Sequence, residues 1–164
     1  MNRLAFRTTL LALLVAAAQL LAANPSAAAA GYRWPLDGAP PVMRGFDPPP
    51  KPWLPGHRGV DLAAAPGAAV FAAADGTVAF DGSVAGKPVV SIDHPGGVRT
   101  TYEPVVATVR AGQGVTQGQQ IGVLQDGHPE CAADACLHWG ARRGEVYLDP
   151  LRLLRPRQVR LLPL

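Results

Sequence analysis

The sequence contains little charge of either sign. It has 15 basic and 12 acidic side chains among 164 residues. Two of the basic residues lie in the first thirty residues, which contain no acid, so the rest of the chain has a net charge of only 13 − 12 = +1. A domain that binds nucleic acid needs a basic stripe together with side chains that contact bases. No such stripe is present, and we expect no nucleic-acid partner.

Long apolar runs are also missing after the first thirty residues, so we expect no integral membrane segment there. Near the start, two arginines precede an apolar stretch from Leu10 to Leu21, and the small residues of NPSAAAA follow. This order is typical of a secretory signal peptide, here residues 1–30, cleaved after Ala30. The alternative is a membrane anchor, but a spanning helix needs about 20 apolar residues and this run is broken at Asn24. We therefore predict a secreted, extracellular protein.

Cysteine is scarce, since Cys131 and Cys136 are the only two in the chain. An even number of cysteines in an exported chain favours a disulfide. A bridge between these two would hold in place the segment that leads into His138. Because it would close a short loop, it would add little to global stability. The competing interpretation is a Cys/His zinc site, which would require free thiolates to persist outside the cell.

No long amphipathic helix is evident after residue 30. Short apolar runs alternate instead with turn residues, as around Asp75-Gly76 and in the loop HPGG. This pattern predicts an all-β fold, a small antiparallel β-sandwich or barrel-like core over residues 57–154. Residues 31–56 are rich in proline and glycine and predict an extended arm. We expect three aromatic side chains to pack this arm onto the body: Trp34, Phe46 and Trp53.

Three side chains are of the types that bind zinc. His57 and Asp61 lie four residues apart in GHRGVD, and His138 lies in CLHWG. Imidazole nitrogens and carboxylate oxygens are both common zinc ligands. Three protein ligands leave a fourth position for water, which is typical of a catalytic rather than a structural zinc site. The sequence therefore indicates a zinc centre formed by residues that are far apart along the chain.

The same residues occur in a recognisable order of motifs. A His-x-x-x-Asp motif (His57 and Asp61) lies in HRGVDLAAAPGAAVFAAADGTV, and a motif that ends in His138 closes the series. Between them stand VVSIDHPGGVRTTYEPV and VRAGQGVTQGQQIGVL. Over residues 32–154 the chain resembles the lysostaphin and LytM-like zinc metallopeptidases. The resemblance implies a β core with a groove, zinc held by His57, Asp61 and His138, and cleavage of peptide bonds in bacterial peptidoglycan.

Two positions depart from the pattern of that family, whose enzymes have two further histidines beside the zinc. Here those positions are Pro104, in TYEPV, and Cys136, in CLH. Proline has no ionisable group, and a disulfide-bonded cysteine cannot act as a general base. We consider Glu103 and His128 as stand-ins. Strand alternation would place Glu103 on the face opposite position 104 unless Pro104 bends the chain, and His128 would have to lean over the groove from its loop.

The resemblance implies a secreted, cell-wall-associated zinc endopeptidase with peptidoglycan peptide as its partner. The alternative is a catalytically inactive relative that binds wall peptide or regulates another wall hydrolase. Retained metal ligands favour the enzyme, and the missing histidines favour the alternative. Residues 155–164 form a basic tail, because no acid follows Asp149 and several arginines do. The tail could make weak contact with an anionic wall polymer or membrane surface, or be a solvated chain end.

Overall fold

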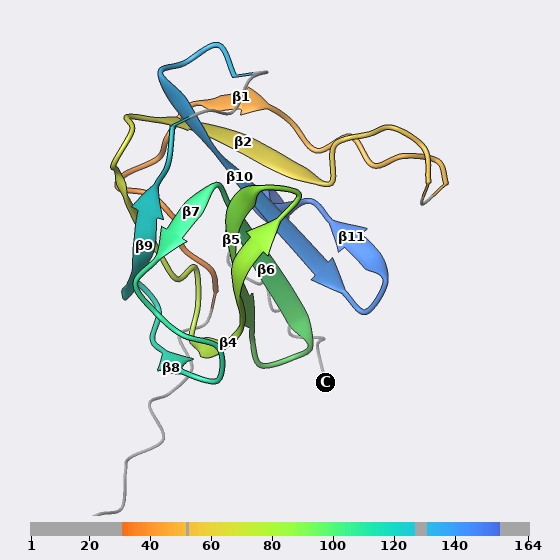
Figure 1. Ribbon diagram of the computed structural model, residues 1–164. Helices are drawn as coiled ribbons and strands as arrows, with labels where there is room; N and C mark the ends of the chain where they lie inside the picture. The colour runs from red at the N-terminus through yellow and green to blue at the C-terminus, as the bar shows by residue number, and fades with distance from the viewer. Residues whose placement is uncertain (1–30, 52, 127–130, 155–164) are drawn as a thin grey trace, which may run out of the picture.

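The computed structural model describes residues 31–51, 53–126 and 131–154 (Figure 1). Its strands are β1 (Val42–Arg44), β2 (Gly59–Ala64), β3 (Ala69–Phe71), β4 (Gly76–Val84), β5 (Lys87–Asp93), β6 (Val98–Glu103), β7 (Val105–Ala107), β8 (Gly114–Val115), β9 (Gln120–Leu124), β10 (Ala135–Arg143) and β11 (Val146–Leu148), followed by the short 3-10 helix η2 (Pro150–Arg152). The larger sheet has the order β1-β2-β10-β6-β5-β4-β8, with β11 paired to β10, and the smaller sheet has the order β3-β9-β7. All pairings are antiparallel. The predicted all-β antiparallel fold is confirmed.

The predicted signal peptide (residues 1–30) and the predicted basic tail (residues 155–164) lie outside the described residues. Within the described ranges, no helix has the length and apolar character needed to cross a lipid bilayer.

Apolar side chains of both sheets meet in one core. Val70, Val105 and Ile121 of the smaller sheet belong to the same buried cluster as Tyr102 and Trp139 of the larger sheet. The rest of this cluster comes from both sheets, the connections between them and the segment before β1: Leu36, Val60, Leu62, Ala72, Ala73, Val78, Val90, Ile92, Val109, Val115, Leu124, Ala135 and Leu137. Burial of this apolar surface is the main stabilising term of the fold.

Strand β10 is the element around which the candidate site is built. Its residues Leu137 and Trp139 are fully buried in the core, so the intervening His138 lies on the opposite face of the sheet. His138 is paired with Asp61 of β2 on one side and with Glu103 of β6 on the other. Directly opposed residues of antiparallel strands have their side chains on the same face. The register therefore places one imidazole between two carboxylates.

The turn between β5 and β6 shows why this hairpin forms where it does. Gly96 and Gly97 have φ values of 85° and 75°, a region that glycine enters without steric cost. The backbone amide of His94 donates to the carbonyl of Val98 at 2.8 Å. The two glycines thus set the register that brings Glu103 to the level of the site.

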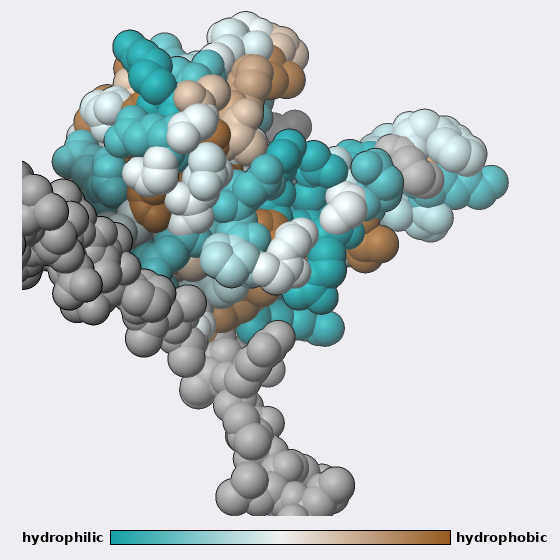
Figure 2. All heavy atoms as spheres, turned by 90° about the horizontal axis from the view of Figure 1, so that it is seen from below, coloured by the Kyte–Doolittle hydropathy of each residue, from teal (hydrophilic) through white to brown (hydrophobic). Residues whose placement is uncertain are grey.

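Part of the N-terminal arm is a strand of the larger sheet, because β1 pairs with β2. Trp34 and Phe46 pack against the core, as predicted from the sequence. The same prediction is wrong for Trp53, whose side chain is 76% exposed. Trp53 lies on the loop between β1 and β2, residues 45–58, which projects from the body of the protein (Figure 1 and Figure 2).

A buried polar chain links the β5–β6 hairpin to the core. The Nδ1–H of His94 donates to the carbonyl oxygen of Asp75 at 2.8 Å, and its Nε2 lies 2.7 Å from Thr100 Oγ1. A further hydrogen bond of 2.9 Å joins Thr100 Oγ1 to the hydroxyl of Tyr102, which also accepts from the Ala73 amide at 3.1 Å. Burial raises the pKa of Tyr102 to about 12. Burial also lowers the pKa of His94 below its ordinary value of 6.5, against the opposing effects of Asp75 and Asp93.

Acidification is therefore expected to destabilise the fold through His94. As the pH falls below 6.5, the unfolded chain takes up this proton before the folded chain does, so the free energy of unfolding decreases until the folded-state pKa is passed. A His94→Asn variant retains an N–H that can donate to the Asp75 carbonyl but cannot titrate. Denaturant unfolding between pH 7 and pH 5 should show a shallower pH dependence for this variant than for the wild type. Equal slopes for the two proteins would contradict the assignment.

Candidate metal centre

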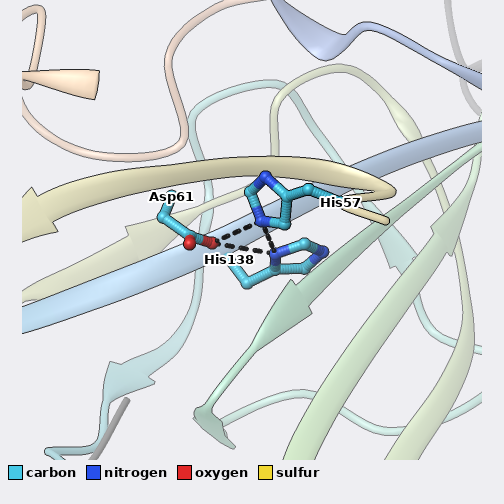
Figure 3. Close-up of side chains that lie close together, drawn as sticks. All are labelled: His57, Asp61 and His138. Carbon is cyan, nitrogen blue, oxygen red and sulfur yellow. Dashed lines mark hydrogen bonds and ion pairs between the residues drawn. The ribbon is translucent and has the colours of Figure 1, made fainter. Parts of the chain in front are cut away.

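Three donor atoms converge on the face of the larger sheet away from the core (Figure 3). His57 Nε2 lies 3.0 Å from Asp61 Oδ1 and 3.1 Å from His138 Nδ1, and the last two atoms are 2.9 Å apart. Among the described residues, these three form a group that could hold a metal ion. The structure therefore brings together the three residues predicted from sequence as metal ligands. Asp61 and His138 meet because β2 and β10 pair in that register.

His57 reaches the centre from the end of the β1–β2 loop. Its backbone pairs with that of Asp47, with N–H to O distances of 2.6 and 3.0 Å. Its Nδ1–H donates to the carbonyl of Gly45 at 2.6 Å. This contact fixes the tautomer, because a neutral ring that donates from Nδ1 has a lone pair at Nε2. A backbone carbonyl in this position is a common partner of metal-binding histidines.

The chemistry of the donor set fits a metal ion. A lone pair at His57 Nε2 and a carboxylate oxygen of Asp61, 3.0 Å apart, are both acceptors and repel each other unless a cation or a proton stands between them. Ligands of a tetrahedral zinc ion with bonds of 2.0–2.1 Å are about 3.3 Å apart, close to the separations here. Asp61 is also only 1% exposed, and a buried carboxylate needs compensating charge.

The centre opens to solvent on the His138 side. His57 and Asp61 are buried, whereas the side chain of His138 is 20% exposed. Gly59, which precedes Asp61 by two residues, provides the space for the His138 ring. A Cβ atom added to Gly59 would lie 2.7 Å from His138 Nε2 and 2.5 Å from the Trp139 carbonyl oxygen. The glycine inside the HRGVD motif is therefore a steric requirement of the site.

Glu103 lies on the same face as the metal centre. It pairs directly with His138 in the β10–β6 register, and its Oε1 is 3.1 Å from Lys87 Nζ. The side chain is 24% exposed. Strand β6 ends at Glu103, and the chain passes through the buried Pro104 into β7 of the other sheet. Strand alternation between positions 103 and 104, on which the sequence-based placement of Glu103 depended, does not apply across this change of sheet.

Cys131 and Cys136 form a disulfide with a Cα–Cα distance of 5.9 Å. The predicted bridge is thus present in the structure. Cys136 is fully buried and pairs with Ala63 in the β10–β2 register. Its sulfur is bonded to Cys131 and titrates no proton. His128, the second candidate stand-in, lies outside the described residues.

Sequence reasoning missed three residues that shape the site. Gly45 supplies the carbonyl that fixes the His57 tautomer, Gly59 makes room for His138, and Lys87 pairs with Glu103. The sequence does carry a signal for Gly59, because this glycine lies between the candidate ligands His57 and Asp61. The other two contacts depend on which backbone and side-chain atoms the fold brings together.

Comparisons with known proteins place the chain in a family. A model described as peptidase family M23 matches residues 55–150. The uncharacterized protein Rv2891 of Mycobacterium tuberculosis is 56% identical over 135 residues, which cover 80% of this chain and 54% of that protein. DD-carboxypeptidase/endopeptidase Mpg of Neisseria meningitidis is 34% identical over 101 residues, covering 61% of this chain and 23% of that protein. The chain thus spans about half the length of the mycobacterial relative and less of the neisserial one.

Solved structures agree with these sequence matches. A zinc-containing peptidase from Vibrio cholerae superposes with a TM-score of 0.60 at 27% identity, over 74% of this chain and 39% of that one. The family model covers more than half of the 164 residues and includes all three converging side chains. The chain belongs to peptidase family M23.

Proposed function

We propose that this protein is a secreted zinc-dependent endopeptidase that cleaves peptides of bacterial peptidoglycan. The observation that carries the proposal is the convergence of His57, Asp61 and His138 on one point, with Glu103 paired to His138 in the neighbouring strand. Export is supported by the pattern of residues 1–30 and agrees with the presence of a disulfide.

His57, Asp61 and His138 would hold the zinc ion. When bound, zinc lowers the pKa of a coordinated water toward about 7 and polarises the carbonyl of the scissile bond. Two imidazoles and a carboxylate also serve as ligands in non-haem iron enzymes. Membership of a peptidase family and likeness to a zinc-containing peptidase favour zinc here.

Glu103 is the candidate general base. It is paired with His138 in the strand register and lies 3.1 Å from the Lys87 ammonium, and a carboxylate there could accept a proton from the attacking water and return it to the leaving amine. A carboxylate in this role would replace the histidines that lysostaphin-like enzymes have at positions 104 and 136.

The substrate class is supported by the relatives. The neisserial relative is named as a DD-carboxypeptidase and endopeptidase, and D,D-peptide bonds are a chemical feature of peptidoglycan stems. A second candidate function is favoured by one observation: Pro104 and the disulfide-bonded Cys136 occupy the positions of the family's additional histidines. On that alternative, the protein binds wall peptide or regulates another hydrolase without cleaving it.

The direct test is release of free amines from purified peptidoglycan. The zinc-loaded protein is expected to release them, and the release should stop with a zinc chelator and resume when zinc is restored. A His57→Ala, Asp61→Ala double variant serves as the inactive control. If folded, zinc-loaded protein releases no amines from several chemotypes of peptidoglycan, the binding or regulatory role is the correct one.

A further inference from the structure

The loop between β1 and β2 (residues 45–58) presents an aromatic side chain to solvent. Trp53 is 76% exposed, the largest fraction among the exposed large apolar side chains of the described residues. Trp34 and Trp139 are packed in or against the core. An exposed tryptophan presents a large apolar face to water. Covering that face with a ligand lowers the free energy of the system. The loop itself stands out from the body (Figure 2).

The loop has a defined shape at its base. The Asp47 and His57 backbones pair with each other, and the Leu54 amide donates to the Lys51 carbonyl at 3.0 Å. Gly56 packs so closely that an added Cβ would lie 2.6 Å from the nitrogen of Pro49. Several prolines restrict the backbone further: Pro48, Pro49, Pro50 and Pro55. Because the loop backbone is already restricted, a ligand that stacks on Trp53 loses little binding free energy to ordering of the loop.

Charge near Trp53 points to the chemistry of the ligand. The Lys51 ammonium lies 5.7 Å from the centre of the Trp53 ring. Residues 45–58 contain two basic residues, Lys51 and Arg58, and one acidic residue, Asp47. An aromatic face beside one cation, Lys51, suits a ligand with an apolar C–H face and an anionic substituent.

We infer that Trp53 stacks against a sugar ring of the glycan strand of peptidoglycan, with Lys51 facing an anionic group of the attached stem. The inference rests on the proposed function for the identity of the polymer. In peptidoglycan the sugars are covalently joined to the peptide stems. In the protein, the loop is likewise covalently continuous with the candidate metal centre. His57 closes the loop and also contributes a donor atom to the centre. A sugar on Trp53 would therefore hold the polymer on the loop that ends at the His57 donor.

The test uses glycan strands from which an amidase has removed the peptides. It measures the dissociation constant of these strands from the zinc-loaded protein. These strands contain no peptide bond to cleave, so binding is separated from turnover. Trp53→Ala should weaken binding about tenfold, the range expected for loss of one stacked aromatic contact, and Trp53→Phe should restore most of it. Val146→Ala, which removes an exposed apolar side chain (64%) on β11, is the matched control and should bind like the wild type.

Binding of stripped strands by Trp53→Ala within twofold of the wild type would overturn the inference. So would a Trp53→Ala defect confined to free stem peptides or to lipid vesicles. The two proposals fail separately. If the wild type releases amines from peptidoglycan but does not bind stripped strands, only the sugar contact is wrong. If it binds strands through Trp53 but releases no amines, the sugar contact stands and the peptidase proposal is wrong.

Discussion

Replacing His138 by alanine is expected to remove zinc from the protein and to abolish peptide hydrolysis. The change leaves His57 and Asp61 as the only members of the donor group, and two ligands do not hold zinc against a competing chelator. Loss of the metal's several kcal/mol of transition-state stabilisation lowers the rate by roughly 10³-fold or more. Zinc per chain, measured by elemental analysis after dialysis, should fall from near one to near zero.

A second histidine substitution provides the matched control for this experiment. His94→Asn also removes a buried imidazole, but in the network around Asp75 and Thr100 rather than at the metal centre. It should retain zinc and turnover at pH 7. A folded His138→Ala variant that keeps a full equivalent of zinc would show that the ligand set is wrong.

Replacing Glu103 by glutamine is expected to lower kcat by roughly 10²- to 10⁴-fold, the range for loss of a positioned general base. The amide has the shape of the carboxylate but cannot accept the proton of the attacking water. Zinc content should not change, because Glu103 is not a member of the donor group. Amine release from peptidoglycan and zinc content are measured on the same samples.

Two further variants make this prediction decisive. Glu145→Gln removes a fully exposed carboxylate in the β10–β11 turn and should leave turnover unchanged. His128→Ala tests the other candidate stand-in. Full turnover by Glu103→Gln together with its loss in His128→Ala would transfer the role of general base from the carboxylate to that histidine.

Local patterns in the sequence were sufficient for much of the fold. Leu137 and Trp139, on either side of His138 in the strand, are both fully buried, as a period of two requires. Turn residues such as Gly96 and Gly97 predicted the β5–β6 hairpin, whose positive φ values require glycine. These features depend on neighbours within a few residues, which is why a period of two and turn chemistry are enough to find them.

Local patterns were insufficient where the chain changes environment. Trp53 was expected to pack on the body like Trp34 and Phe46, but it projects from a loop whose path no periodicity describes. The sequence left open whether Glu103 follows the alternation of its strand relative to position 104 or Pro104 bends the chain. In the structure, β6 ends at Glu103 and Pro104 leads into the other sheet, so Glu103 is placed by its partner His138.

By itself, the sequence predicted the class of the fold, the disulfide partners and the three side chains of the candidate metal centre, because residue types, short spacings and the resemblance to a known family limit the local backbone and the available donor chemistry. Only the tertiary structure decided that His138 lies between Asp61 and Glu103, that the Gly45 carbonyl sets the His57 tautomer and that Lys87 holds Glu103. These contacts join residues far apart along the chain. Their geometry follows from strand register, which is set by how the core packs as a whole.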